Sequence, residues 1–123
     1  MSSAHTPVAR MGTETLGDVV VLRVVGDVDL ANSDQLRDLG VSLLDGAAAA
    51  LVLDLTEVGF FASSGIAALA HLHGHNRGNG RHPIHVAVGE HVRRTLEMTA
   101  MHTLLPLHDT AEQALDAARE DID

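Results

Sequence analysis

The chain contains no cysteine, lysine, tryptophan or tyrosine, and it has only two phenylalanines. Without cysteine, a disulfide framework and a thiolate metal site are both excluded. Without lysine, a nucleotide-binding P-loop is excluded as well. The scarcity of aromatic rings leaves little surface on which bases or sugars would stack. Seventeen acidic residues against eight arginines give a formal charge of −9, which argues against nucleic acid as a partner.

Long apolar runs are missing too, and none approaches the ~20 residues that a membrane-spanning helix needs. The opening Met-Ser-Ser-Ala-His-Thr-Pro has no charged segment followed by an apolar one, so no signal peptide is expected. The length of 123 residues fits one domain. We therefore expect a soluble, cytoplasmic protein, with residues 1–7 as a loose lead-in, residues 8–118 as the folded domain and residues 119–123 as an acidic tail.

Apolar patterning predicts alternating strands and helices along most of the chain. The β-branched run over 19–25 is apolar on both faces apart from Arg23, which predicts a buried strand, and the run over 51–55 predicts a second one. Leucines at 36, 39, 43 and 44 recur with helical spacing. Further strands are expected over 84–88 and 104–107, and further helices from Ser63, over 90–99 and over 111–118.

Several residues are typical of helix ends. Asn32, with Gln35 three residues later, predicts a capping box, and Gly46 is predicted to be the C-cap of that helix. Glycines within 74–80 are expected to break the helix that begins at Ser63. Residues 109–112 supply either a direct cap or a capping box for the last helix.

The order of elements indicates the fold class. From residue 51 onward, strands and helices alternate with short connections, and right-handed crossovers would make such strands parallel. Pro106 demotes the last strand to a sheet edge, and another edge strand is expected near Val8. The sequence therefore predicts an α/β fold with a mixed, mostly parallel sheet of about four to five strands, flanked by about four helices.

The loop over 59–65 is where chemistry is expected. It places two hydroxyls, Ser63 and Ser64, at the start of a helix, where free N–H groups and the positive end of the dipole favour negative charge. In the simpler interpretation, one serine is only an N-cap, worth ~1 kcal/mol. In the functional alternative, a phosphate sits here, either from a ligand or attached covalently to serine.

Three motifs carry a resemblance to a known family. Residues 51–66, Leu-Val-Leu-Asp-Leu-Thr-Glu-Val-Gly-Phe-Phe-Ala-Ser-Ser-Gly-Ile, resemble the signature of STAS domains, and more narrowly of the bacterial anti-sigma factor antagonists. That signature is an apolar strand, a loop, an aromatic and Asp-Ser-Ser-Gly before a helix. Residues 24–29 and 92–101 resemble two further motifs of the family, in the right order. Ala62 is a departure, because the family has Asp before the two serines.

The resemblance implies a non-enzymatic protein without a cofactor that works by binding other proteins. In that family the unmodified antagonist binds an anti-sigma factor that is also a serine kinase, and so frees the sigma factor. The kinase phosphorylates the first serine of the motif, here Ser63, which breaks the complex, and a phosphatase resets the switch. Ser64 would be the neighbouring cap. The implied partner-binding residues are Asp27, Asp29, Phe61, Ala62, Ser63, Ser64 and Gly65, and Phe60 and Phe61 are expected to offer docking rings.

Two alternatives stay open. A protein with the same fold could be a non-switching scaffold or a transporter-associated subunit. A protein of another class could be a small Ser/His hydrolase or a metal-binding protein, since His71 and His75 lie four residues apart. Gly74 lies between those histidines, however, and Ser63 lacks the first glycine of a nucleophile elbow. We expect no metal site, and we place His85 on the surface or on a sheet face.

Overall fold

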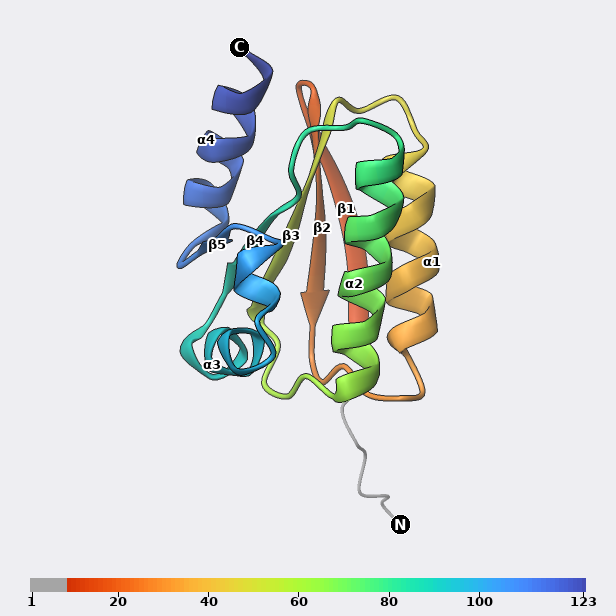
Figure 1. The fold of residues 1–123 in the computed structure, drawn as a ribbon, viewed down its shortest axis with the longest axis vertical. Helices are drawn as coiled ribbons and strands as arrows, with labels where there is room; N and C mark the ends of the chain where they lie inside the picture. The colour runs from red at the N-terminus through yellow and green to blue at the C-terminus, as the bar shows by residue number, and fades with distance from the viewer. Residues whose placement is uncertain (1–8) are drawn as a thin grey trace.

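The computed structural model describes residues 9–123 (Figure 1). Its strands are β1 (Arg10–Leu16), β2 (Val19–Val25), β3 (Ala50–Glu57), β4 (His85–Val88) and β5 (Leu107–His108). Its helices are α1 (Ser33–Leu44), α2 (Ser63–Gly78), α3 (Glu90–Met98), the short 3-10 helix η1 (Met101–Thr103) and α4 (Ala111–Ile122). The five strands form a sheet in the order β1-β2-β3-β4-β5. β1 is antiparallel to β2 and the other pairs are parallel, which confirms the mixed, mostly parallel α/β sheet.

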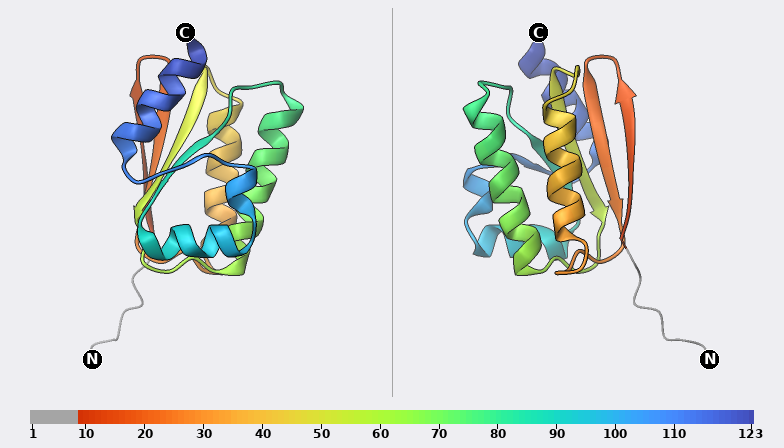
Figure 2. Two further views of the ribbon diagram at one scale, coloured as in Figure 1. Left: turned by 60° about the vertical axis from the view of Figure 1, so that its left-hand side comes forward. Right: turned by 90° about the vertical axis from the view of Figure 1, so that its right-hand side faces the viewer.

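The helices cover the two faces of the sheet unequally. α1 and α2 lie side by side on one face, and α4 lies on the other (Figures 1 and 2). Side chains alternate along β3, so Leu53 joins the larger core beneath α1 and α2, while Val52 joins a smaller core beneath α4. Within residues 9–123, no helix is both long and apolar enough to cross a membrane.

Both edge strands differ from the sequence prediction. Val8, where an edge strand was expected, lies outside the described residues, and β1 begins at Arg10. β1 is mostly exposed, so pairing with β2 rather than apolar burial defines it, and Gly17 (φ 65°) makes the turn between them. At the other edge, β5 has only two residues, after Pro106, where a strand over 104–107 was expected.

Two elements extend further than predicted. β3 continues to Glu57, two residues beyond the strand predicted over 51–55, because Glu57 still pairs with Val25 of β2. α2 passes through Gly74, where a break was expected, and ends at Gly78. Buried Leu72 and Asn76 on either side of Gly74 hold the helix against its neighbours, so tertiary packing outweighs the low helix propensity of glycine.

The ends of α1 are formed differently from the prediction. Asn32 occupies the N-cap position, but its side chain makes no cap hydrogen bond, so the predicted capping box with Gln35 is wrong. The helix ends at Leu44 with Asp45 as the C-cap, one residue before the predicted Gly46.

The start of α4 confirms the direct cap predicted for the last helix. The Thr110 side chain accepts a hydrogen bond from the Gln113 backbone N–H (3.1 Å). The Gln113 side chain in return accepts from the backbone N–H of Asp109 (3.1 Å). The helix then runs to Ile122, so most of the segment 119–123 is helical rather than a tail.

A candidate partner-binding surface at the start of helix α2

The surface around Ser63 is assembled from the segments that follow β2 and β3. These strands are parallel neighbours, so both end on the same side of the sheet, at the lower end in Figure 1. The backbone N–H of Val28 donates to the carbonyl of Phe60 (2.9 Å), and the N–H of Ala62 donates to the carbonyl of Val28 (2.9 Å). Asp27 and Asp29 therefore flank a short bridge directly beside the start of α2, as the resemblance implied.

Asn32 fixes the loop that carries the two aspartates. Its side-chain oxygen accepts from the backbone N–H of Asp29 (3.0 Å), and its side-chain NH₂ donates to the carbonyl of Asp27 (2.9 Å). A carboxylate oxygen of Asp29 accepts from the N–H of Ala31 (2.9 Å). The buried amide of Asn32 thus holds the loop instead of capping α1. Sequence reasoning missed this role, although Asn following aspartates at short spacing is typical of such turns.

The two phenylalanines of the next loop have opposite placements. Phe61 is 4% exposed and belongs to the core, whereas Phe60 is 50% exposed. The ring of Phe61 lies against Gly65, where an added Cβ would be 2.9 Å from Cε2 of Phe61 and 3.0 Å from Cγ1 of Val28. The expectation that both rings offer docking contacts is therefore wrong for Phe61, which supports the surface from beneath, and Phe60 is the ring that reaches solvent.

The two serines also differ, and neither is the N-cap. Ala62 occupies that position in an extended conformation (φ −73°, ψ 167°), so the predictions that Ser63 or Ser64 caps α2 are wrong. Ser63 is exposed at the first position of the helix. The hydroxyl oxygen of Ser64 is buried and has no hydrogen-bond partner within the described part of the chain. The first N–H groups of α2 lack helical partners, so the positive end of the helix dipole lies at Ser63.

A shallow groove of about 320 Å³ between α1 and α2 extends this surface. Ser64 and Leu30 both line it, and Leu30 is 82% exposed. Arg37 also lines the groove, but its guanidinium contacts Asp38 (3.0 Å) and Asp34 (3.3 Å), and these two carboxylates raise its pKa. Leu30 was missed in the sequence, where its only signal was an apolar residue inside a polar turn.

Of the two histidines considered as metal ligands, His71 is exposed beside the groove between α1 and α2, and His75 contacts a carboxylate. His75 lies 2.7 Å from a carboxylate oxygen of Asp45, at the far end of α2. His85 is buried on the sheet face toward α4, one of the two placements expected for it. Among residues 9–123, no group of three or more His, Asp or Glu side chains is arranged to hold a metal ion.

Comparison with known proteins places this geometry in a family. The model of the STAS domain family matches residues 10–114. An anti-sigma factor antagonist from Mycobacterium paratuberculosis is 26% identical, with a TM-score of 0.79 over 91% of this chain and 95% of that chain. An anti-sigma-factor antagonist (STAS) domain protein from Planctomyces limnophilus is 19% identical, with a TM-score of 0.74 over 88% of this chain and 96% of that one. The Bacillus cell fate determinant SpoIIAA in its phosphorylated form is 17% identical, with a TM-score of 0.65 over 88% and 98%. The chain belongs to the STAS domain family.

Proposed function

We propose that this protein is an anti-sigma factor antagonist in which Ser63 is a phosphorylation switch. The unphosphorylated form binds an anti-sigma factor that is also a serine kinase, in the cytoplasm, and thereby releases the sigma factor. Phosphorylation of Ser63 breaks that complex, and a phosphatase restores it. Membership of the STAS family and similarity to the mycobacterial antagonist support this role.

The observation that carries the proposal is the difference between the two serines. A kinase must reach the hydroxyl that it modifies, and Ser63 is exposed, whereas the oxygen of Ser64 is buried. Ser63 is also the first serine of the motif, the one that the family resemblance selects. SpoIIAA, a protein of similar fold, is known in a phosphorylated form.

Electrostatics explains how one phosphate would act as a switch. A phosphoserine carries about −1.5 to −2 charges, which the N-terminus of α2 stabilises while the protein is free. In a complex, the same phosphate would be pressed beside Asp27 and Asp29 and would lose water, which opposes binding. A penalty of ~3 kcal/mol weakens binding more than a hundredfold. The switch therefore requires no change of fold.

The rest of the surface offers contacts rather than reacting groups, which supports binding over catalysis. Exposed Leu30 and Phe60 offer apolar contacts, and the half-buried Asp27 and Asp29 offer carboxylates beside them. The proposed partner-binding residues remain Asp27, Asp29, Ala62, Ser63 and Ser64, with Phe61 and Gly65 holding them in place from the core.

The proposal is tested by using three versions of the protein as baits in a lysate of the native cells. Wild type should retain an ATP-binding kinase-like protein, and Ser63→Asp should retain at least about tenfold less, because a carboxylate carries part of the phosphate charge. Ser42→Asp is the matched control, since Ser42 is exposed near the other end of α1. It should bind as wild type does. When the captured kinase is incubated with ATP and the wild-type protein, mass spectrometry should detect phosphorylation at Ser63.

Two results would count against the proposal. Equal retention by wild type and Ser63→Asp would indicate a STAS scaffold whose partner ignores position 63. Failure of every bait to retain an ATP-binding protein would remove the kinase partner itself.

A further inference from the structure

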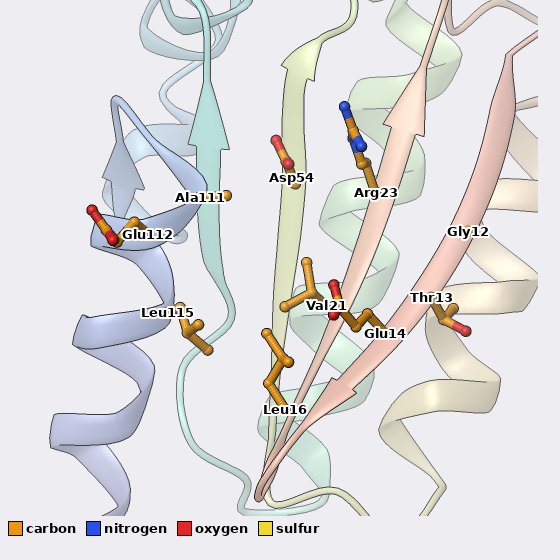
Figure 3. Close-up of a pocket in the computed structure, with 10 residues that line it drawn as sticks. All are labelled: Gly12, Thr13, Glu14, Leu16, Val21, Arg23, Asp54, Ala111, Glu112 and Leu115. Atoms are coloured by element: carbon orange, nitrogen blue, oxygen red, sulfur yellow. The ribbon is translucent and has the colours of Figure 1, made fainter.

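The sheet face that carries α4 is only half covered. α4 packs on β3 and β4 through a small core that includes Val52, Ala87 and Ala118. Between α4 and the strands β1 and β2, a groove of about 470 Å³ remains open (Figure 3). None of the residues that line this groove belongs to the surface around Ser63. The groove therefore needs an explanation of its own.

The floor and one wall of the groove are apolar. Leu16 and Val21 come from the strands, and Leu115 comes from α4 on the opposite side (Figure 3). All three side chains are only partly buried. Gly12 opens the groove further, because a Cβ at this position would meet no described atom within 4 Å beyond its chain neighbours.

Asp54 places a carboxylate at one end of this apolar floor. The residue is 8% exposed, and one carboxylate oxygen accepts from the backbone N–H (3.0 Å) and the hydroxyl (2.6 Å) of Thr56. The other oxygen makes no hydrogen bond with any described residue. Arg23 is the neighbour of Asp54 in the strand register, but it pairs with Glu57 (2.6 Å) instead. A largely buried carboxylate that has one oxygen free of hydrogen bonds, and no ion-pair partner among residues 9–123, is suited to receive a positively charged group.

Three of the four charged side chains that line the groove are acidic, and the fourth is Arg23. The acidic ones are Glu14 from β1, Glu112 from α4 and Asp54. The charge of Arg23 is compensated by Glu57. The apolar floor and the mostly acidic rim together fit a ligand that has both an apolar surface and positively charged groups.

We propose that this groove binds a basic amphipathic helix of a protein partner. The apolar side of the helix would lie on Val21 and Leu115, and an arginine or lysine would reach Asp54. A helix is favoured because it would continue the α4 layer over the uncovered strands. The strand segment from Gly12 to Leu16 spans ~13 Å, the length of about nine helical residues. Because the groove lies apart from Ser63, this inference does not depend on the proposed switch.

The test is an NMR titration of the isotope-labelled protein with a synthetic peptide of about 18 residues. The peptide has leucines on one helical face and arginines on the other, and the titration is done at about 150 mM salt. The amides of Gly12, Val21, Asp54 and Leu115 should shift in a saturable manner. A peptide of the same pattern with glutamates in place of the arginines should leave them unchanged.

Matched variants separate groove binding from general attraction to an acidic protein. Gly12→Leu should fill the groove and lower the affinity for the basic peptide at least about tenfold. Thr15→Leu is the control, because it adds a leucine at an exposed neighbouring position of β1, and it should bind the peptide as wild type does. Asp54→Asn keeps the oxygen that Thr56 contacts while removing the charge, and it should also weaken binding about tenfold.

Three outcomes would overturn the proposal. The first is shifts scattered over the acidic surface rather than in the groove. The second is wild-type affinity in both Gly12→Leu and Asp54→Asn. The third is an equally strong response of the groove to butylamine alone, which would indicate a site for a small amine instead of a helix.

Discussion

At the scale of single residues, Gly65 shows how packing sets the position of the candidate surface. Its missing side chain lets the first turn of α2 lie directly on the ring of Phe61 and on Val28. Val28 is also the residue whose backbone bridges to the loop before α2. The lack of a Cβ at Gly65 therefore allows the close packing that fixes the position of Ser63.

Substitution of Gly65 by alanine is expected to destabilise the protein. The new Cβ would lie 2.9 Å from the Phe61 ring, closer than real contacts allow, so strain of about 1–3 kcal/mol should outweigh the gain in helix propensity. Gly74→Ala is the control within the same helix, because its Cβ would face open space, and it should gain up to ~1 kcal/mol. Urea unfolding measures both, and equal effects of the two substitutions would contradict the role given to Gly65.

Residue types in the candidate site could be predicted from the sequence, but their exposure could not. The motif around Ser63 and Ser64 identified the loop, yet only the packing of α2 against α1 decides that Ser64 turns inward. Phe60 and Phe61 are adjacent in an irregular loop, so no periodicity tells which ring is buried. The bridge to Val28, a contact distant in sequence, makes that choice.

At the scale of elements, the loop between β2 and α1 depends on Asn32. We expect Asn32→Ala to lower the free energy of unfolding by about 1–3 kcal/mol, because the backbone groups of Asp27 and Asp29 would lose their buried partner. Partner binding should weaken as well, since both aspartates would lose their fixed positions. Urea unfolding and the pull-down measure the two effects.

Asn79→Ala is the matched control for this prediction. Asn79 is exposed after the end of α2, and within residues 9–123 its side chain makes only a long contact to His75 (3.4 Å). The control should change stability by less than ~0.5 kcal/mol. A comparable loss of stability in both variants would show that the hydrogen bonds of Asn32 do not stabilise the loop between β2 and α1.

Elements with a strong apolar pattern were predictable, and those defined by pairing were not. β2, β3 and β4 are rich in β-branched and leucine residues, so their existence followed from composition. β1 contains Thr, Glu and Gly and exists because β2 offers it a free edge. The length of α2 was underestimated for a similar reason, since local propensity at Gly74 contains no information about the neighbours of Leu72.

At the scale of the whole molecule, a chain of side chains joins the sheet to the last helix. His85 on β4 lies 2.8 Å from His108 on β5 through one ring nitrogen. Its other ring nitrogen lies 2.7 Å from a carboxylate oxygen of Asp121, in the last turn of α4. The three residues thus connect β4 and β5 with the last turn of α4.

This connection predicts a loss of stability on acidification. Burial lowers the pKa of His108 below its usual 6.5, and the charges of His85 and Arg93 lower it further, while Asp109 opposes them. The unfolded chain then binds the proton more readily, so folding stability should fall as the pH drops through about 6.5. Urea midpoints measured between about pH 7.5 and 5.5 test this.

His108→Gln should show a shallower loss of stability over the same pH range than wild type. His102→Gln is the control, because His102 is exposed on η1, and it should follow wild type. Parallel curves for wild type and His108→Gln would show that other groups cause the acid sensitivity.

The two edges of the sheet have a consequence for the behaviour of many copies together. β5 offers only two residues of backbone next to Pro106, and β1 carries the exposed charged residues Arg10 and Glu14. Short strands, proline and charge at sheet edges discourage the addition of further strands from other molecules. A formal charge of −9 adds mutual repulsion. The protein should therefore tolerate being made in large excess without aggregating, which would let its abundance be set by demand for its partners.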